Sequence, residues 1–322
     1  MKFVPLSGNE VYCYAIIKEV NKKVSSKGGV YLDLNLSDAT GTINAKLWDY
    51  NEAVHDAYAA GDIVKVGGVV TDFNGAKQLR VSKIRHTHDG DNVNMADLVK
   101  TAEYPPQKMY DELYNLAGGF ENRTLKTIVT TLLEDKKEKL LYYPAAYRLH
   151  HAMLGGLLYH TLSVVRLCQK VAEIYPTVDK ELLLSGAILH DIGKTDELEA
   201  ATSGSSTGYS IEGNLIGHLA GGAVLIATAA QKLGIYDQPE IRLLMHMSLS
   251  HHGIPEYGAA VYPAFLEAEI LSKCDNLDAT VYEFEAETEK LEKDGFSGRV
   301  PFLDNRKVYN HARKEQKGTK LF

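Results

Sequence analysis

The sequence predicts a two-domain protein in which a small all-β barrel is followed by an all-α domain. Two observations on hydrophobic periodicity support this order. The apolar residues alternate with a period of two over residues 1–88, and they follow the 3.6-residue period of helices over residues 107–294. A length of 322 residues also suits two domains, since a domain usually spans about 100–200 residues.

The N-terminal region has the strand and turn pattern of a five-stranded barrel of the OB type. Four alternating stretches are clear after the first strand: residues 30–36, 42–48, 62–70 and 77–84. Turn residues such as Gly28-Gly29 and Asn74-Gly75 separate them. A helix is expected over residues 50–60, between the third and fourth strands, because five strands with a helix after the third make a small OB barrel.

One face of the barrel is predicted to bind single-stranded nucleic acid. Alternation places these apolar residues inside the barrel: Leu32, Leu34, Ile43, Ala45, Leu47, Val64, Val66, Leu79 and Val81. The outward positions combine aromatic rings with cations, and they are Tyr31, Lys46, Trp48, Lys65 and Arg80. OB folds hold single strands by stacking bases on rings and neutralising phosphates. The alternative is that these aromatic side chains line an interface between the two domains.

Composition marks the remaining boundaries along the chain. Residues 89–106 begin with Asp-Gly-Asp, end with Pro-Pro and are predicted to link the barrel to a helical domain of residues 107–294. Residues 201–208 are rich in Ser, Thr and Gly and are predicted to form a flexible loop. Residues 295–322 are predicted to be a basic C-terminal tail. Charge is uneven, since residues 1–88 carry a net +2 and the remainder −9.

Composition also excludes several classes of protein. With 45% hydrophobic and 24% charged residues the chain is not largely disordered, and a net charge of −7 excludes a histone-like coat of cations. Three widely spaced cysteines, Cys13, Cys168 and Cys274, fit a reducing compartment. The sequence has no run of 18 apolar residues and its N-terminus lacks the features of a signal peptide, so a cytoplasmic protein without membrane contact is expected.

Six polar residues in the helical region are predicted to point inward from apolar helix faces. His190 and Asp191 end the apolar stripe of a helix predicted over residues 180–190. A buried Asp needs a metal, a cation or several hydrogen-bond donors. The other four lie on similar inward stripes or beside glycines, and they are His160, His218, His251 and Asp275. Imidazole and carboxylate together suit Mn, Fe, Zn or similar ions, so the set predicts a metal centre.

The order of these residues resembles that of the HD-superfamily metal phosphohydrolases. Over nearly the whole chain the resemblance is closer still to the YhaM-type 3′–5′ exoribonucleases of bacteria. Beside the barrel, it rests on HHAMLGGLLYHT (150–161), HDIGK (190–194), YSIEGNLIGH (209–218), HHGIPEYG (251–258), CDNLDA (274–279) and LDNR (303–306). An ordered set of this kind is far more specific than a single His-Asp pair.

The resemblance implies two divalent metal ions per chain. Manganese is the expected metal, with iron, cobalt or zinc as alternatives. The implied ligands of the first ion are His160, His190, Asp191 and Asp275. The implied ligands of the second ion are Asp191 as a bridge, His218, His251 and, as an alternative that stays open, His252.

Asp191 and Lys194 are implied to be catalytic residues. Lys194 would hold a phosphate oxygen as charge develops during hydrolysis. The alternative for Lys194 is a cation at a helix C-terminus, where the helix dipole favours it. For His150 and His151, local packing or capping explains their presence as well as a contact with substrate or metal does.

The function that the resemblance implies is the hydrolysis of single-stranded RNA from its 3′ end to nucleoside 5′-monophosphates. Single-stranded DNA is an alternative substrate. A second hypothesis is a phosphohydrolase of nucleotides or cyclic dinucleotides, with a regulatory barrel. A third is a metal-free binding module. The sequence leaves the oligomeric state open, and a homo-oligomer is one alternative.

Overall fold

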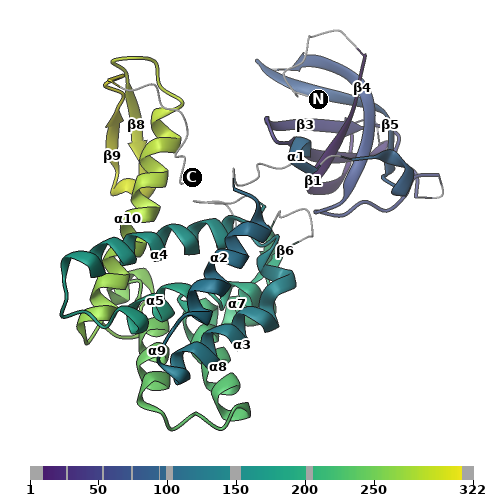
Figure 1. Cartoon of the computed structure of the whole chain (residues 1–322). Helices are drawn as coiled ribbons and strands as arrows, with labels where there is room; N and C mark the ends of the chain where they lie inside the picture. The colour runs from purple at the N-terminus through teal and green to yellow at the C-terminus, as the bar shows by residue number, and fades with distance from the viewer. Residues whose placement is uncertain are drawn as a thin grey trace. The chain divides into compact units, whose positions relative to one another are not determined.

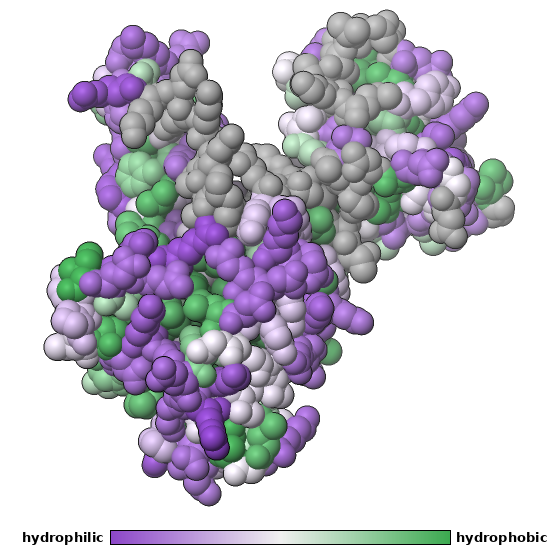
Figure 2. Space-filling view, in the orientation of Figure 1, coloured by the Kyte–Doolittle hydropathy of each residue, from purple (hydrophilic) through white to green (hydrophobic). Residues whose placement is uncertain are grey.

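The chain divides into two units of internally contacting residues. One unit comprises Met1–Thr101 with Ala200–Thr207, and the other comprises Ala102–Glu199 with Gly208–Phe322. The structure, a computed structural model, describes residues 10–26, 28–52, 54–73, 75–93, 95–98, 104–145, 154–200 and 206–313. Hydrophilic residues cover much of the face of the second unit that Figure 2 shows. Among the described residues, no helix has the length and apolar character needed to cross a membrane.

The first unit is a closed five-stranded barrel, as predicted from the alternating pattern (Figure 1). Its strands are β1 (Glu10–Val24), β2 (Val30–Asp38), β3 (Gly41–Leu47), β4 (Ile63–Phe73) and β5 (Ala76–His86). They are hydrogen-bonded in the order β1-β2-β3-β5-β4, and β4 closes the barrel on β1. Only the pairing of β3 with β5 is parallel, which is the Greek-key arrangement of an OB fold.

The barrel core confirms the predicted orientation of the strands. All nine residues predicted to point inward belong to one buried cluster. A glycine allows the barrel to close tightly where the register shifts between Gly67 and Gly68. A Cβ atom on Gly68 would lie 2.2 Å from the carbonyl oxygen of Arg80, so any side chain there would push β4 away from β5.

The helix predicted over residues 50–60 is wrong for the part that the structure describes, which forms turns and coil instead. Tyr50 and Tyr58 pack against the barrel core, and the Tyr58 hydroxyl donates to the carbonyl oxygen of Ile84 at 3.0 Å. Val54 is 78% exposed, so the segment has no apolar stripe whose burial would stabilise a helix. Tyr50 and Tyr58 therefore anchor this segment to the barrel, and its described residues form no helix.

Two short elements after β5 pack on the barrel. They are η1 (Asp89–Asp91) and α1 (Met95–Leu98). The Asp91 carboxylate accepts two hydrogen bonds of 2.7 Å from Arg85, and Leu98 is buried. The backbone N–H of Ala39 donates to the carbonyl oxygen of Asp97 at 3.0 Å. The first part of the predicted linker is therefore folded against the first unit.

The second unit is a helical domain organised around a buried central helix. Its longer helices are α2 (Pro106–Gly118), α3 (Arg123–Leu140), α4 (Gly156–Ile174), α5 (Lys180–Leu189), α8 (Gly217–Lys232), α9 (Pro239–Ser250) and α10 (Leu266–Thr288). The shorter helices are α6 (Lys194–Glu197) and α7 (Ile211–Leu215). Every residue of α5 from Leu182 to Leu189 is buried, and α5 contacts α3, α4, α9 and α10. Because α5 is central, its C-terminal end is surrounded by other helices (Figure 1).

Short strands accompany the helices, although the sequence pattern does not predict them. β6 (Leu198–Ala200) pairs with β7 (Ser206–Tyr209), while β8 (Phe296–Val300), η3 (Pro301–Leu303) and β9 (Arg306–Tyr309) form a hairpin in the predicted basic tail. Strands of three to five residues are too short for a period-two pattern to stand out. Residues 201–205 of the predicted flexible loop and residues 314–322 of the tail lie outside the described residues.

Candidate metal centre

A cluster of histidines and aspartates surrounds the C-terminal end of α5. The side chains come from separate helices and loops, as the inward stripes predict, and Lys194 lies beside them at the start of α6. Among the described residues, three groups place metal-ligating atoms within 4.8 Å of one another. The members are His160 of α4, His190 and Asp191 after α5, His218 of α8, His251 and His252 after α9, and Asp275 of α10.

Four of these residues form what we call the first ligand group: His160, His190, Asp191 and Asp275. His160 Nε2 lies 3.0 Å from Asp275 Oδ1, 3.3 Å from His190 Nε2 and 3.5 Å from Asp191 Oδ2. His190 Nε2 lies 3.4 Å from Asp191 Oδ2 and 3.8 Å from Asp275 Oδ1. Two ligands of one ion are about 3–3.5 Å apart when metal–ligand bonds are about 2.0–2.2 Å. The ligand atoms of His160, His190 and Asp275 lie within 4.8 Å of one another, and Asp191 Oδ2 is 3.4–3.5 Å from both histidines, so the spacing suits one coordination shell.

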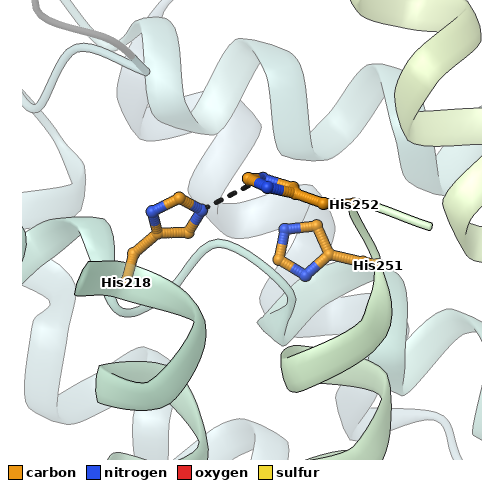
Figure 3. Close-up of side chains that lie close together, drawn as sticks. All are labelled: His218, His251 and His252. Atoms are coloured by element: carbon orange, nitrogen blue, oxygen red, sulfur yellow. Dashed lines mark hydrogen bonds between the residues drawn. The ribbon is translucent and has the colours of Figure 1, made fainter. Parts of the chain in front are cut away.

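Asp191, His218, His251 and His252 form the second ligand group. Asp191 Oδ1 lies 3.5 Å from His218 Nε2 and 3.6 Å from His251 Nε2. His218 Nε2 and His252 Nε2 are 3.3 Å apart, and Figure 3 shows the three imidazole rings turned toward one another. The two carboxylate oxygens of Asp191 thus face different ligand groups, which is the position of a bridging ligand.

Unpaired polar atoms in the centre fit a metal site. Asp191 Oδ1 and His251 Nε2 are buried without a hydrogen-bond partner, and they are two of only four such side-chain atoms within the described residues. An unsatisfied buried polar atom costs about 1–3 kcal/mol. An ion bound between these two atoms would remove that cost, and a set of imidazole and carboxylate ligands suits divalent transition metals.

Each of the five histidines is held by a second contact at its other ring nitrogen. The Nδ1 contacts are His160 to Asp278 at 2.7 Å, His190 to the Ala187 carbonyl at 2.8 Å, His218 to Glu197 at 2.9 Å, His251 to the Ser248 carbonyl at 2.9 Å and His252 to the Tyr257 carbonyl at 2.7 Å. These oxygens accept hydrogen bonds, so Nδ1 carries the proton and Nε2 faces the centre. Contacts of this kind orient metal-binding histidines.

The carboxylates around His160 set its protonation. Burial lowers the pKa of His160, but Asp275 and Asp278 outweigh that effect and raise it to about 10. Ser163 donates a hydrogen bond to the other oxygen of Asp278, which fixes that carboxylate. Burial lowers the pKa of His251 to about 4, so its Nε2 lone pair is available at neutral pH. Metal binding at the first group must therefore displace a proton from His160.

Lys194 supplies a buried positive charge next to the shared carboxylate. Its Nζ lies 2.7 Å from Asp191 Oδ2, and Asp191 outweighs burial to raise the pKa of Lys194. Burial raises the pKa of Asp191, but Lys194 and His190 hold it well below its usual range. Lys194 begins the four-residue helix α6 and lies beyond the last turn of α5, which ends at Leu189.

A glycine lets this turn reach the neighbouring helix. A Cβ atom on Gly193 would lie 2.2 Å from the carbonyl oxygen of His218 and 2.7 Å from the backbone nitrogen of Gly222. Any side chain at this position would separate Asp191 from His218. The HDIGK stretch therefore requires glycine because the turn after α5 packs directly on α8.

Sequence reasoning missed the residues that orient the ligands. Asp278 follows Asp275 by one helical turn on α10, and Glu197 lies one turn after Lys194, so helical spacing was the available signal. Both carboxylates contact histidines that are distant in sequence, by 118 and 21 residues respectively. His150 and His151, whose role the sequence left open, lie outside the described residues.

Part of the predicted nucleic-acid-binding set forms one patch on the barrel, which we call the barrel face. The rings of Tyr31 and Trp48 lie 4.5 Å apart between centroids, and Lys46 Nζ lies 5.6 Å from the Tyr31 centroid. Lys46 also pairs with Asp33 at 2.5 Å. Arg80 is exposed and stands opposite Lys46 in the register of β3 and β5. An aromatic pair with flanking cations is therefore present on this side of the barrel.

Lys65 is not beside the other predicted nucleic-acid-binding residues. It lies on β4, opposite Tyr14 of β1 and Arg85 of β5, whereas Arg80 stands five positions earlier on β5. Lys65 Nζ lies 3.7 Å from Asp91 and 5.3 Å from the Tyr14 ring centroid. Alternation correctly placed Lys65 on the outside, but strand order puts it on another side of the barrel.

Comparison with known families defines the class of protein. Residues 157–280 match the HD domain family, and residues 14–87 match the OB-fold nucleic acid binding domain family. The HD match contains every member of the two ligand groups. The fold and the centre thus define a metal-dependent phosphohydrolase of the HD type preceded by an OB-fold domain.

Similarity to named relatives extends over most of the chain. Proteins named 3′-5′ exoribonuclease YhaM from Bacillus licheniformis and Geobacillus sp. are each 38% identical over 302 residues, covering 94% of this chain and 95% and 92% of the relatives. The protein of that name from Bacillus subtilis is 37% identical over 94% of this chain and 95% of its own. A domain of replication protein A from Methanococcus maripaludis matches 27% of this chain and 94% of its own, with 28% identity and a TM-score of 0.24. The chain belongs to the YhaM 3′–5′ exoribonuclease family.

Proposed function

We propose that this protein is a divalent-metal-dependent 3′–5′ exoribonuclease that hydrolyses single-stranded RNA to nucleoside 5′-monophosphates. One observation carries the proposal: in a chain of the YhaM family, Asp191 directs its two oxygens into two separate ligand groups. Two ions sharing one carboxylate are the arrangement that many enzymes use to cleave phosphodiesters.

The ligand groups are assigned to two metal ions. His160, His190 and Asp275 would hold the first ion, His218, His251 and His252 the second, and Asp191 both. Manganese is the metal we expect, with iron, cobalt or zinc as alternatives. When bound, such ions supply Lewis acidity, which lowers the pKa of water and stabilises negative charge on phosphate oxygens.

The protein's own contribution is orientation and charge. The second contacts at Nδ1 fix the imidazole rings before substrate arrives, so no reorganisation is needed during the reaction. Asp275, His218 and Lys194 keep 16%, 12% and 10% of their side chains exposed, whereas His160, His190 and His251 are at most 1% exposed. A phosphate would therefore reach the centre on the side of these less deeply buried side chains.

Lys194 is assigned the role of binding a non-bridging phosphate oxygen. Its ammonium is buried, charged and held by Asp191, so it is already in place when substrate binds. A positive charge fixed in a site that excludes most water stabilises developing phosphate charge more strongly than a solvated lysine does.

The barrel face is assigned the role of holding RNA upstream of the cleavage point. A strand whose 3′ end occupies the metal centre leaves only upstream nucleotides for the barrel. Tyr31 and Trp48 offer stacking surfaces, and Lys46 and Arg80 offer charge for phosphates. The three cysteines are free and buried, which fits the cytoplasmic location that we propose.

A time course on a denaturing gel tests the proposal. The substrate is a single-stranded RNA with a 5′ label and a stable hairpin near its 3′ end, incubated with Mn²⁺ and the protein. We expect single-nucleotide shortening that stops at the hairpin base, with 5′-monophosphates as product, because bases must be unpaired to thread and stack. A matched DNA strand shows whether DNA is also a substrate. Internal cuts, immediate release of the labelled nucleotide, or activity confined to cyclic dinucleotides would overturn the proposal.

A further inference from the structure

The C-terminal hairpin presents an exposed aromatic pair. Phe296 on β8 stands opposite Tyr309 on β9, with ring centroids 4.7 Å apart. The two residues remain 65% and 43% exposed, so the pair does not serve the interior of the domain. The Tyr309 hydroxyl donates to Asp294 at 3.0 Å, which fixes the orientation of its ring.

The opposite face of the hairpin anchors it to the helical domain. Val300, Leu303 and Val308 are buried in a small cluster against Phe284 of α10 and Leu291. Figure 1 shows β8 and β9 beside the C-terminal part of α10. Because the anchor lies on the inner face, the outer side chains are available for binding without loss of the fold.

Positive charge lies next to the aromatic pair. Arg299 and Lys307 stand directly opposite each other, an arrangement of like charges that destabilises a hairpin unless an anion binds. Among the described residues, no carboxylate forms an ion pair with either one, and Arg299 donates only to the carbonyl oxygen of Asn305 at 3.2 Å. Residues 295–313 contain four Lys and Arg against one Asp, Asp304, which pairs with Arg306 at 3.4 Å. Figure 2 shows mostly hydrophilic residues at this end.

We propose that the outer face of this hairpin is a second binding site for single-stranded RNA, separate from the barrel. Bases would stack on Phe296 and Tyr309, and backbone phosphates would bind Arg299 and Lys307. Gly298 lies on the same strand with open space around the position of a Cβ atom, so a strand can approach the backbone there. This site rests on the proposed function, because the RNA that it holds is the substrate of the metal centre.

The position of the hairpin sets the length of RNA that can use it. Helix α10 carries both Asp275 of the centre and Phe284 of the hairpin anchor, nine residues apart. Nine residues of α-helix span about 14 Å, which is roughly four stacked nucleotides at about 3.4 Å each. A stacked strand with its 3′ end in the centre would therefore need more than about four nucleotides to reach the hairpin.

Fluorescence anisotropy of a labelled single-stranded RNA 20-mer tests the site in the full-length protein. The titrations contain a chelator so that hydrolysis does not occur. We expect Phe296→Ala/Tyr309→Ala to weaken binding about tenfold or more. Arg299→Ala/Lys307→Ala should reduce the steepness of the plot of log affinity against log salt by about 1.4, because two phosphate contacts are lost.

Matched controls remove equivalent groups from elsewhere in the same unit. Tyr175→Ala removes an exposed ring, and Lys180→Ala/Lys232→Ala removes two exposed cations. Both controls should bind RNA as the wild type does. Wild-type affinity and salt dependence in the hairpin variants would overturn the proposal. The proposal would also be overturned if the hairpin variants changed the oligomeric state and left the RNA affinity unchanged. The face would then join copies of the chain.

Photo-crosslinking of the wild-type protein gives a test that needs no variant to fold. A 20-mer containing 4-thiouridine should crosslink to residues 296–309 as well as to the barrel. Crosslinks confined to the barrel would overturn the second site. Hydrolysis of a dinucleotide by the wild type with Mn²⁺ tests the proposed function separately, because a dinucleotide is too short to reach the hairpin. If the dinucleotide is not hydrolysed, the proposed function of the metal centre fails. The measurements of RNA binding by the hairpin are unaffected by that outcome.

Discussion

The barrel face and the metal centre both combine rings with charged side chains, but the two regions differ in solvent exposure. On the barrel face, Trp48 is 40% exposed, and Lys46 pairs with Asp33 with the two side chains 15% and 14% exposed. In the centre, Asp191 is 2% exposed, and every histidine has a second partner that fixes its ring. Several exposed groups can each contribute part of the binding of a single strand, whereas a buried charge depends on its few fixed partners. Loss of one group should therefore be tolerated on the barrel face and not in the centre.

Asp191→Ala is the strongest test of this contrast. The variant removes the one carboxylate shared by both ligand groups, so we expect both ions to be lost and turnover to fall by more than ~10³-fold, since removal of a mere supporting contact already costs about 10–100-fold. Elemental analysis and a nuclease assay measure the two effects, and circular dichroism checks the fold. Asp237→Ala, at an exposed position of the same unit, is the control. Wild-type metal content in the Asp191 variant would contradict the bridging assignment.

Variants of two supporting carboxylates, Asp278 and Glu197, can test whether the two ligand groups bind their ions independently. Asp278→Asn weakens the contact that orients His160, and Glu197→Gln weakens the contact that orients His218. Each variant should lower the affinity of one ion about 10–100-fold and leave the other ion bound. Metal titrations followed by calorimetry measure the two affinities. If each variant weakened both ions equally, the two groups would not be independent sites.

Acid should weaken metal binding at the first ligand group. The pKa of His160 is raised to about 10, so below pH 10 this imidazole carries a proton that an ion must displace. Affinity therefore falls as the pH falls, by about tenfold per pH unit for each proton released. Calorimetry in two buffers of different ionisation enthalpy counts the protons. Metal binding between pH 7 and 9 without proton release would contradict this protonation of His160.

Trp48→Ala should have the smallest effect of these variants, because several exposed residues of the barrel face contribute to RNA binding. Loss of one stacking ring should weaken binding of a single-stranded 20-mer by roughly 1–3 kcal/mol while dinucleotide hydrolysis is retained. Anisotropy titrations measure the affinity. Phe73→Ala removes a more exposed ring from the end of β4 and is the control. Equal affinity in the Trp48 variant and the control would favour the interpretation of these rings as a domain interface.

Local sequence patterns predicted the elements and many of the inward residues. Strand alternation placed Leu34 and Val66 in the barrel core, because the side chains of a strand alternate whatever lies beyond it. Helical spacing likewise directed His190 and Asp191 inward from the buried helix α5. The same kind of reasoning failed for residues 50–60, where two tyrosine anchors outweigh local helix preference.

Local patterns in the sequence were therefore enough to predict the barrel, the helical domain and the side chains that meet at the end of α5. Tertiary structure alone decided that Asp191 faces two groups, that Asp278 and Glu197 hold the histidines, and that Lys65 lies apart from Lys46. This difference arises because sequence periodicity is a local property, whereas these contacts join distant parts of the chain. Periodicity reports the direction of a side chain from its own backbone, whereas a contact depends on how separate helices and strands pack.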